Sequence, residues 1–249
     1  MRLSTDGLIV KEKNVGENDR LVVALTRHKG LITAFAPGAR RLKNRNASST
    51  GLLCYSNLTF FRGKDTYKID EASAIQVFFP LRGDIERLSL AQYFCELSLC
   101  LAPEGGEAED FLRLVLNALH YLSTGGRDAL LIKSVVELRM LCLAGYMPDL
   151  LACGGCGAFE GERMYLDPVD GGLYCQDCRG GARAISGLLP LSRGVLAGLR
   201  HIAYASFDKL FSFALPENGL KALNAVTERY LLTQTDRRFT TLDFYHSLA

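Results

Sequence analysis

Two Cys-x-x-Cys pairs carry the clearest chemistry in this sequence: Cys153 with Cys156, and Cys175 with Cys178. Four thiolates at this spacing are typical of a tetrahedral zinc site, because a two-residue gap lets one tight turn direct both sulfurs of a pair toward one ion. Two disulfides, a thioredoxin-like redox pair and chance spacing are the alternatives. The flanking sequence lacks the βαβ pattern that a redox pair needs, so a metal site is the favoured interpretation.

The predicted metal site is closed and therefore structural. Four protein sulfurs fill the tetrahedron and leave no position for a water molecule that the metal could acidify. The 18 residues between the pairs contain two short apolar runs around a turn at 167–172, which predicts a hairpin joining two metal knuckles, as in a zinc ribbon. We expect one structural Zn2+ per chain, which would supply folding free energy to this glycine-rich segment.

The rest of the chain offers no catalytic motif. None of the four histidines lies in a metal-ligand or nucleophile motif, and no glycine-rich loop is followed by Lys-Ser or Lys-Thr, which argues against a P-loop nucleotide hydrolase. The acidic residues Glu107, Glu109 and Asp110 stand at the predicted start of a helix, where carboxylates favour the helix dipole. The sequence therefore predicts a binding protein rather than an enzyme, with no catalytic residue.

A basic segment supplies the second candidate site. Residues 38–46 hold four cations within six positions, among small and polar neighbours, and they predict an exposed loop. Residues 1–80 carry 13 Lys/Arg against 7 Asp/Glu, a net +6, whereas the remaining residues carry 16 against 20, a net −4. This asymmetry favours a polyanion partner, and a solvated charge cluster is the alternative. The predicted contacts to a polyanion are Arg40, Arg41, Lys43 and Arg45 in the loop, with Lys11, Lys13, Arg20, Arg27 and Lys29 on its β scaffold.

Two kinds of periodicity indicate the elements that position these sites. Between residues 7 and 79, five short β-rich runs alternate with turns, which predicts a five-stranded barrel of the OB-fold type. After Pro80, apolar residues recur at helical spacing over 90–101, 111–122 and 131–142, and again over 188–202 and 220–230. We expect an α+β protein in four parts: an OB-fold domain at 1–80, a helical domain at 81–148, a four-cysteine zinc-ribbon module at 149–184, and C-terminal helices at 185–249 that pack on the helical domain.

Aromatic residues of the β region are candidates for stacking on nucleic-acid bases. Most are expected to fill the barrel core. Strand alternation places Tyr55 and Phe61 on one face and Phe60 on the other, so the three do not all point inward. The sequence singles out no stacking residue among Phe35, Tyr55, Phe60, Phe61 and Tyr67.

Composition places the chain among ordinary globular proteins. Its 249 residues are 48% apolar, enough to bury a substantial core, and no apolar run reaches membrane-spanning length. The first residues lack the apolar core of a signal peptide, so we expect a cytoplasmic protein with no membrane partner. The cysteines outside the pairs stand singly among apolar residues and are predicted to lie in the core: Cys54, Cys95, Cys100 and Cys142.

The order of these features, together with three groups of residues, makes the chain resemble the bacterial RecO family of recombination mediators. The N-terminal group comprises Gly16-Glu-Asn-Asp19, Thr26, Gly30 to Ala34 and Gly38-Ala-Arg-Arg41. The central group comprises Glu137 to Leu141, Gly145 to Leu150 and Cys153 to Gly157. The closing group is the segment Arg-Phe-Thr-Thr-Leu-Asp-Phe at 238–244. The resemblance spans nearly the whole chain.

This resemblance implies an N-terminal OB-fold, a helical domain and, as in some members, a zinc finger. It further implies a non-enzymatic role in recombinational repair: binding of single- and double-stranded DNA, annealing of complementary strands, and work with RecR that helps RecA load onto DNA coated by single-strand-binding protein. The implied partners are DNA, RecR and the C-terminal tail of single-strand-binding protein, with RecA an indirect partner. The implied location is the cytoplasm, in association with the nucleoid.

The acidic tail of single-strand-binding protein ends in an apolar residue with a free carboxylate, so its site should combine cations with an apolar pocket. Lys133 and Arg139, on the third predicted helix beside Leu131 and Leu138, are the candidates.

Two other functions stay open. One is an accessory factor that binds RNA in transcription or RNA metabolism, since zinc ribbons and OB-folds also serve RNA, and the other is a metal-dependent nuclease.

Overall fold

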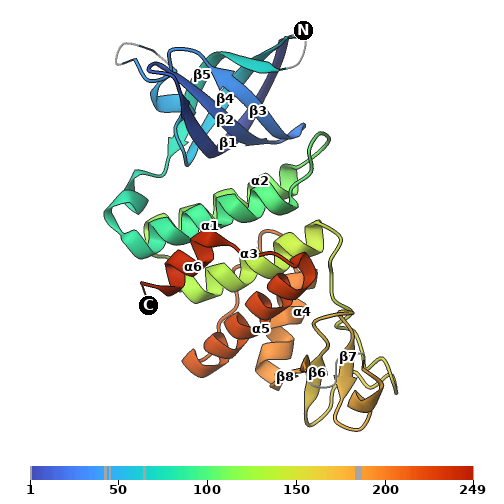
Figure 1. Ribbon diagram of the computed structural model, residues 1–249. Helices are drawn as coiled ribbons and strands as arrows, with labels where there is room; N and C mark the ends of the chain where they lie inside the picture. Colours follow the sequence, from blue (N-terminus) through green and yellow to red (C-terminus); the bar gives the residue numbers. More distant parts are fainter. Residues whose placement is uncertain (1, 42–43, 45, 64–65, 183–186, 249) are drawn as a thin grey trace. The chain divides into compact units, whose positions relative to one another are not determined.

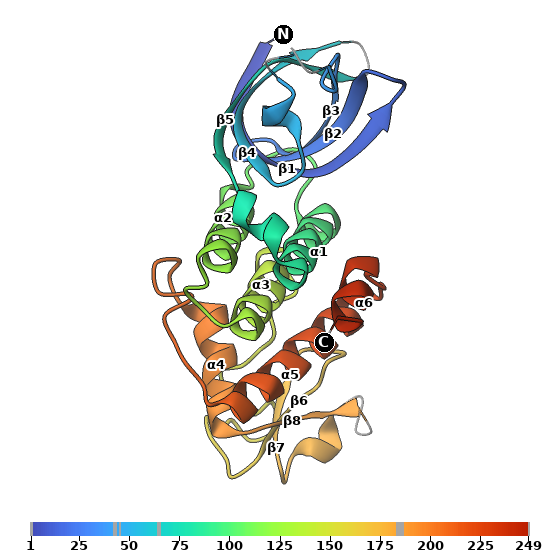
Figure 2. The ribbon, with the colours of Figure 1, turned by 90° about the vertical axis from the view of Figure 1, so that its left-hand side faces the viewer.

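A computed structural model describes residues 2–41, 44, 46–63, 66–182 and 187–248 of the protein (Figure 1). Five strands at the N-terminal end close into a barrel, seen as a ring in Figure 2. They are β1 (Arg2–Val15), β2 (Asp19–Thr26), β3 (Gly30–Ala36), β4 (Cys54–Arg62) and β5 (Tyr67–Val77). The strand order is β1-β2-β3-β5-β4, with β4 returning to β1, and only β3 and β5 pair in parallel. This five-stranded barrel is the expected OB-fold.

Side chains that alternate between the inner and outer faces of the strands fill the interior of the barrel. In β4, Leu58 and Phe60 are buried, whereas Asn57 and Phe61 are exposed. Because successive side chains point to opposite faces of a strand, this confirms the predicted separation of Phe60 from Phe61. The barrel core is a single apolar cluster that includes Ile9, Val22, Ala24, Ile32, Ala34, Leu58, Phe60 and Ile69.

Three helices complete the first compact unit, which comprises residues 1–125 together with 239–249. α1 (Ile85–Leu101) begins at Asp84, whose carboxylate accepts the Arg87 N–H at 3.1 Å. α2 (Glu109–Thr124) ends at Gly125, which has the left-handed conformation. α6 (Thr240–His246) packs against α1, where the Glu96 carboxylate accepts the Thr241 N–H at 3.0 Å. Sequence periodicity did not predict α6, because its 7 residues are too few for an apolar repeat.

A close backbone contact joins the barrel to the connection between α1 and α2 within this unit. Leu31 donates its N–H to the carbonyl of Pro103 at 2.9 Å, and Ala108 donates to the carbonyl of Arg27 at 2.9 Å. Gly30 lies beside these bonds with a φ of +58°, and a Cβ there would stand 2.0 Å from the Pro103 carbonyl oxygen. Only glycine fits this position.

The second compact unit, residues 126–238, combines three helices with a small sheet. α3 (Ala129–Leu143) packs on α4 (Arg193–Tyr204) and on α5 (Glu217–Thr235), and α4 packs on α5. The antiparallel sheet has the order β7-β6-β8 and consists of β6 (Met164–Leu166), β7 (Leu173–Cys175) and β8 (Leu189–Leu191). β6 and β7 form the hairpin that the sequence predicts between the cysteine pairs.

The prediction of a helix from residue 188 is wrong for its first residues. Leu189–Leu191 pair with β6 as β8, and α4 begins only at Arg193. Ser192 marks the boundary, because its hydroxyl accepts the Val195 N–H at 3.3 Å and caps the helix. An apolar run this short has no periodicity that separates a strand from a buried helix.

Buried charges tie α3 to α5. Lys133 Nζ lies 2.7 Å from Glu137 Oε1 and 2.6 Å from Glu228 Oε2. The Thr227 hydroxyl donates to Glu137 at 2.7 Å. Lys133 and Glu137 are fully buried, so these bonds compensate for the loss of their hydration.

The predictions about the single cysteines, the domain boundaries and membrane-spanning segments have different outcomes. Cys54 and Cys95 are buried as predicted, whereas Cys100 and Cys142 are partly exposed. The compact units divide the chain near residues 125 and 238, so the domain boundaries expected after residues 80, 148 and 184 stay a prediction about separately folding parts. Among the described residues, no helix is both long enough and apolar enough to cross a membrane.

Candidate metal centre and nucleic-acid interface

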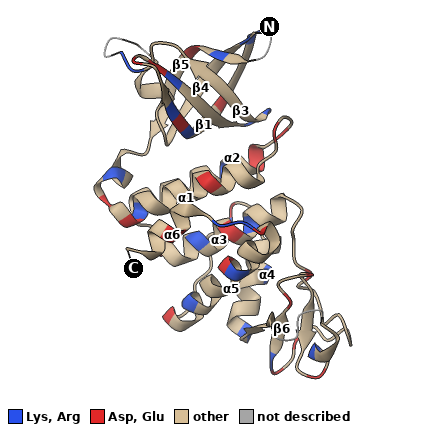
Figure 3. Cartoon of the chain, in the orientation of Figure 1, with Lys and Arg blue, Asp and Glu red and all other residues tan. Residues whose placement is uncertain are grey.

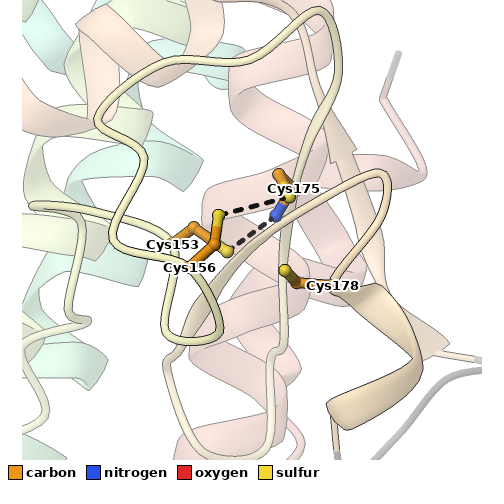
Figure 4. Close-up of side chains that lie close together, drawn as sticks. All are labelled: Cys153, Cys156, Cys175 and Cys178. Atoms are coloured by element: carbon orange, nitrogen blue, oxygen red, sulfur yellow. Dashed lines mark hydrogen bonds between the residues drawn. The ribbon is translucent and has the colours of Figure 1, made fainter.

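The four paired cysteines come together in the second compact unit (Figure 4). Their Sγ atoms all lie within 4.8 Å of one another, and the sulfurs of Cys156 and Cys175 are 3.8 Å apart. Four sulfurs held about 2.3 Å from a central zinc ion would be roughly 3.8 Å apart, so the cluster has the dimensions of a four-thiolate metal site. All four are free thiols, so this structure contains neither of the two disulfides considered as an alternative.

Two tight turns position the sulfurs. Gly157 donates its N–H to the carbonyl of Cys153 at 2.8 Å, and Cys178 donates to the carbonyl of Cys175 at 3.2 Å. The turns approach each other at Gly155, where a Cβ would lie 2.7 Å from the Cβ of Cys178. The absence of a side chain at residue 155 therefore lets the two pairs meet.

The surroundings of Cys153 favour a thiolate. Burial alone would raise its pKa, but hydrogen bonds from backbone N–H groups of Cys175, Cys156 and Gly155 outweigh burial and lower the pKa to about 6. The Cys175 N–H donates to the Cys153 sulfur at 3.3 Å. The thiolate is the form that binds a metal ion, and a set of four sulfurs fits zinc, with each tetrahedral position filled by the protein.

Arg200 of α4 braces the first cysteine turn, and the sequence pattern did not reveal it. Its Nε donates to the carbonyl of Leu150 at 2.8 Å, and its Nη2 donates to the carbonyls of Leu151 at 3.1 Å and Phe159 at 2.6 Å. Its guanidinium carbon lies 3.8 Å from the centre of the Phe159 ring. These partners flank Cys153 and Cys156 on both sides, so one side chain ties together the two ends of the metal-binding turn.

Some of the predicted DNA-binding cations gather at the turn between β1 and β2. Arg40 donates its N–H to the carbonyl of Asn18 at 2.9 Å and its Nη1 to the carbonyl of Gly16 at 3.2 Å. Arg41 follows it in an exposed position, and Lys13 is exposed near the end of β1. The structure thus brings these three cations to one end of the barrel. Lys43 and Arg45 lie outside the described residues.

The other predicted cations of the barrel differ from these three in exposure or in position along the strands. Lys11 is exposed in the middle of β1, and Lys29 is exposed in the turn between β2 and β3, at the other end of β2. Arg20 is mostly buried and lies 3.4 Å from Glu12. Figure 3 shows that Lys and Arg of the barrel are interspersed with Asp and Glu.

Arg27 has an internal role that the sequence pattern did not predict. Its Nε and Nη2 donate to the Asp6 carboxylate at 3.0 and 2.7 Å, and its Nη1 pairs with Glu109 at the start of α2. Asp6 also accepts the Tyr55 hydroxyl. Burial alone would raise the pKa of Asp6, but the bonds from Arg27 and Tyr55 lower it overall. The charge of Arg27 is neutralised within the chain, so this placement does not support its predicted contact with DNA.

The two residues predicted to hold the partner tail are engaged inside the second unit. Lys133 is buried against Glu137 and Glu228. Arg139 Nη1 donates to the carbonyl of Ala203 at 2.6 Å, at the C-terminal end of α4, and its guanidinium lies 5.1 Å from the Phe207 ring centre. Neither presents an unengaged cation at the surface, so these side chains hold helices together. Helical spacing in the sequence could not predict whether Lys133 is buried or faces solvent.

Two family models match this chain and together cover most of it. The model described as "Recombination protein O N terminal" matches residues 1–78, and the one described as "Recombination protein O C terminal" matches residues 82–243.

Curated proteins give the same result over the full length. The chain is 35% identical to "DNA repair protein RecO" of Acetivibrio thermocellus over 246 residues, which is 99% of this chain and 97% of that protein. It is 30% identical to the protein of the same name from Symbiobacterium thermophilum over 248 residues, 98% of this chain and 97% of that protein. The corresponding protein of Dehalococcoides mccartyi is 29% identical over 243 residues, 96% and 94% of the two chains.

Proposed function

Because the chain belongs to the RecO family of DNA repair proteins, we propose that it is a non-enzymatic, DNA-binding mediator of recombination. In this role it binds single- and double-stranded DNA, anneals complementary strands and, with RecR, helps RecA load onto DNA coated by single-strand-binding protein. The observation that carries the proposal is the match to named DNA repair proteins over nearly the whole chain. The expected location is the cytoplasm, at the nucleoid.

The proposed DNA contact is the end of the barrel at the β1–β2 turn. Arg40, Arg41 and Lys13 are exposed there, and Lys43 and Arg45 follow Arg41 in the sequence. Lysine and arginine neutralise phosphates and release the counterions that DNA carries, which supplies affinity without reading the sequence. Annealing requires two polyanions to approach each other, and cations that bind either backbone lower that repulsion.

The proposed metal is one zinc ion held by Cys153, Cys156, Cys175 and Cys178. The sulfur distances and the turn geometry support this assignment. Bound there, zinc would supply folding free energy to the ribbon around β6 and β7. The four-sulfur shell reserves no position for a substrate, in keeping with a structural role.

The proposed protein partners are RecR and the C-terminal tail of single-strand-binding protein, with RecA acting downstream. Family membership supports these partners. Since Lys133 and Arg139 are engaged within the chain, the tail site is expected to use other cations.

Strand annealing tests the proposed function directly. Complementary single strands coated with single-strand-binding protein are mixed with and without the protein, and duplex formation is followed by a fluorophore and quencher on opposite strands. We expect faster annealing, with the DNA of unchanged length on a denaturing gel. Annealing at the rate of the protein-free reaction contradicts the mediator role, and shortened DNA in the presence of a divalent ion identifies a nuclease instead.

A further inference from the structure

We propose that the outer face of the barrel carries a base-stacking platform, in which an unpaired base of single-stranded DNA stacks on Phe61. This inference rests on the proposed DNA binding and adds a contact that distinguishes single-stranded from double-stranded DNA. It is carried by three observations on strands β1, β4 and β5: the register, the exposure of the ring, and the charges beside it.

The register places Phe61 in the middle of a cross-strand row. It faces Arg2 of β1 on one side and Lys68 of β5 on the other. Residues directly paired across antiparallel strands share a face, with Cβ atoms about 4.5–5.5 Å apart. The neighbouring row points inward and packs in the barrel core: Leu3, Phe60 and Ile69. The outer row is therefore an aromatic ring between two cationic side chains.

Phe61 has the free ring surface that stacking needs. It is 52% exposed, and it is the one exposed aromatic side chain within the strands that the structure describes. Of the other aromatic candidates of the barrel, Phe35 is only partly exposed, and three are engaged elsewhere. Phe60 and Tyr67 meet edge to face with ring centres 6.0 Å apart, and the Tyr55 hydroxyl is bound to Asp6. An apolar ring held outward by a paired strand is a preformed stacking surface.

The charges around Phe61 suit a nucleic-acid strand. Lys68 is exposed on the same face as Phe61 and forms no ion pair among the described residues. Arg2 of the same row is paired with Asp70, so Lys68 is the cation expected to meet phosphates. Proteins that bind single strands combine such cations with aromatic rings, because a phosphate stands on each side of a stacked base.

The platform selects for unpaired bases. Any base offers a π face, so stacking on Phe61 carries little sequence preference. A base inside a duplex is already stacked on both sides and is not available unless it leaves the helix. Loss of the ring is therefore expected to weaken binding of single strands and to leave duplex binding unchanged.

The absence of tryptophan from the chain allows a direct test. Phe61→Trp introduces a single indole, whose emission a stacked base quenches. We expect titration with an oligothymidine to quench Phe61→Trp strongly and saturably, whereas a duplex of the same length has little effect. The matched control is Phe79→Trp, which replaces another exposed phenylalanine, 67% exposed, outside the strand row. Similar quenching of both variants, or of neither, contradicts the platform.

Affinity measurements complete the test. Phe61→Ala is expected to weaken single-strand binding about tenfold, with duplex affinity within about twofold of the wild type, in anisotropy titrations of labelled DNA. Because Phe61 lies outside the core, the thermal unfolding midpoint should stay near that of the wild type. If the wild type binds no DNA at all, the proposed function fails. If it binds DNA and Phe61→Ala binds single strands equally well, the stacking inference alone fails, and a partner protein on this face becomes the alternative.

Discussion

Asp6 allows a pH-dependent test at the scale of single residues. It accepts hydrogen bonds from Arg27 and Tyr55, and Arg27 also pairs with Glu109. We expect Asp6→Asn to lower the free energy of unfolding at neutral pH by about 2 kcal/mol, because the bonds it removes involve charged groups. The pKa of Asp6 in the folded protein lies below its ordinary value of 3.8, so its contribution is complete above that value and disappears as pH falls through the folded-state pKa. Urea titrations at decreasing pH should therefore show the variant and the wild type converging.

Asp70→Asn is the matched control for this comparison. Asp70 also pairs with an arginine, Arg2, but its side chain is 44% exposed. Exposed pairs contribute little, so we expect a change below about 1 kcal/mol at each pH. A stability difference for Asp6→Asn that stays constant from neutral to acid pH would show that its carboxylate charge is not what stabilises the fold.

Residue roles were predictable where spacing along the chain decides them. The Cys-x-x-Cys pairs met as predicted, since each pair depends on its own turn. Partner choice across the fold was not predictable. Arg27, Lys133 and Arg139 look like surface cations in sequence, yet their partners are Glu109, Glu228 and the carbonyl of Ala203. No local pattern distinguishes such a cation from one that faces solvent or DNA.

At the scale of elements, Arg200 links α4 to the first cysteine turn. Its three carbonyl bonds fix the segments on both sides of Cys153 and Cys156. We expect Arg200→Gln to weaken metal binding about 10- to 100-fold, the effect typical of losing a group that orients metal ligands. Competition with a chromophoric chelator measures this affinity.

Arg193→Gln is the matched control, because Arg193 is an exposed arginine at the start of the same helix. It should leave metal affinity unchanged. Arg200→Lys should recover little, since an ammonium does not reproduce the planar fork that reaches three carbonyls. Equal metal affinities for Arg200→Gln and the wild type would mean that the cysteine turns keep their shape without this brace.

Elements with a long or regular pattern were predictable, and short ones were not. The five barrel strands and the helices α1, α2, α3 and α5 appear where alternation or helical spacing placed them. β8 contradicts the predicted helix. It is a strand because it pairs with β6, and the sequence of Leu189–Leu191 does not indicate that pairing. α6 was not predicted because it is stabilised by packing on α1 and by Glu96. In both cases tertiary contacts decide the local conformation.

At the scale of the whole molecule, the two candidate sites belong to different compact units. The cysteine cluster lies within residues 126–238, and Arg40 with its neighbours lies in the unit that contains the barrel. A structural metal acts through the stability of the segment that binds it, whereas phosphate contacts act through the affinity for DNA. Stability and DNA affinity should therefore respond separately to changes at the two sites.

Two variants measured side by side test this separation. Cys156→Ser with Cys178→Ser should release the metal and lower the unfolding midpoint by about 10 °C, because metal binding contributes folding free energy. Its affinity for single-stranded DNA should stay within about threefold of the wild type, since the barrel keeps its own core.

Replacement of Arg40, Arg41, Lys43 and Arg45 by alanine should lower the affinity for DNA without lowering the stability of the fold. We expect an unchanged midpoint, roughly tenfold weaker binding, and a salt dependence whose slope falls by about 0.7 for each phosphate that is no longer neutralised. Differential scanning fluorimetry and anisotropy titrations on the same preparations measure both quantities, and parallel losses in both variants would show that the ribbon takes part in binding DNA.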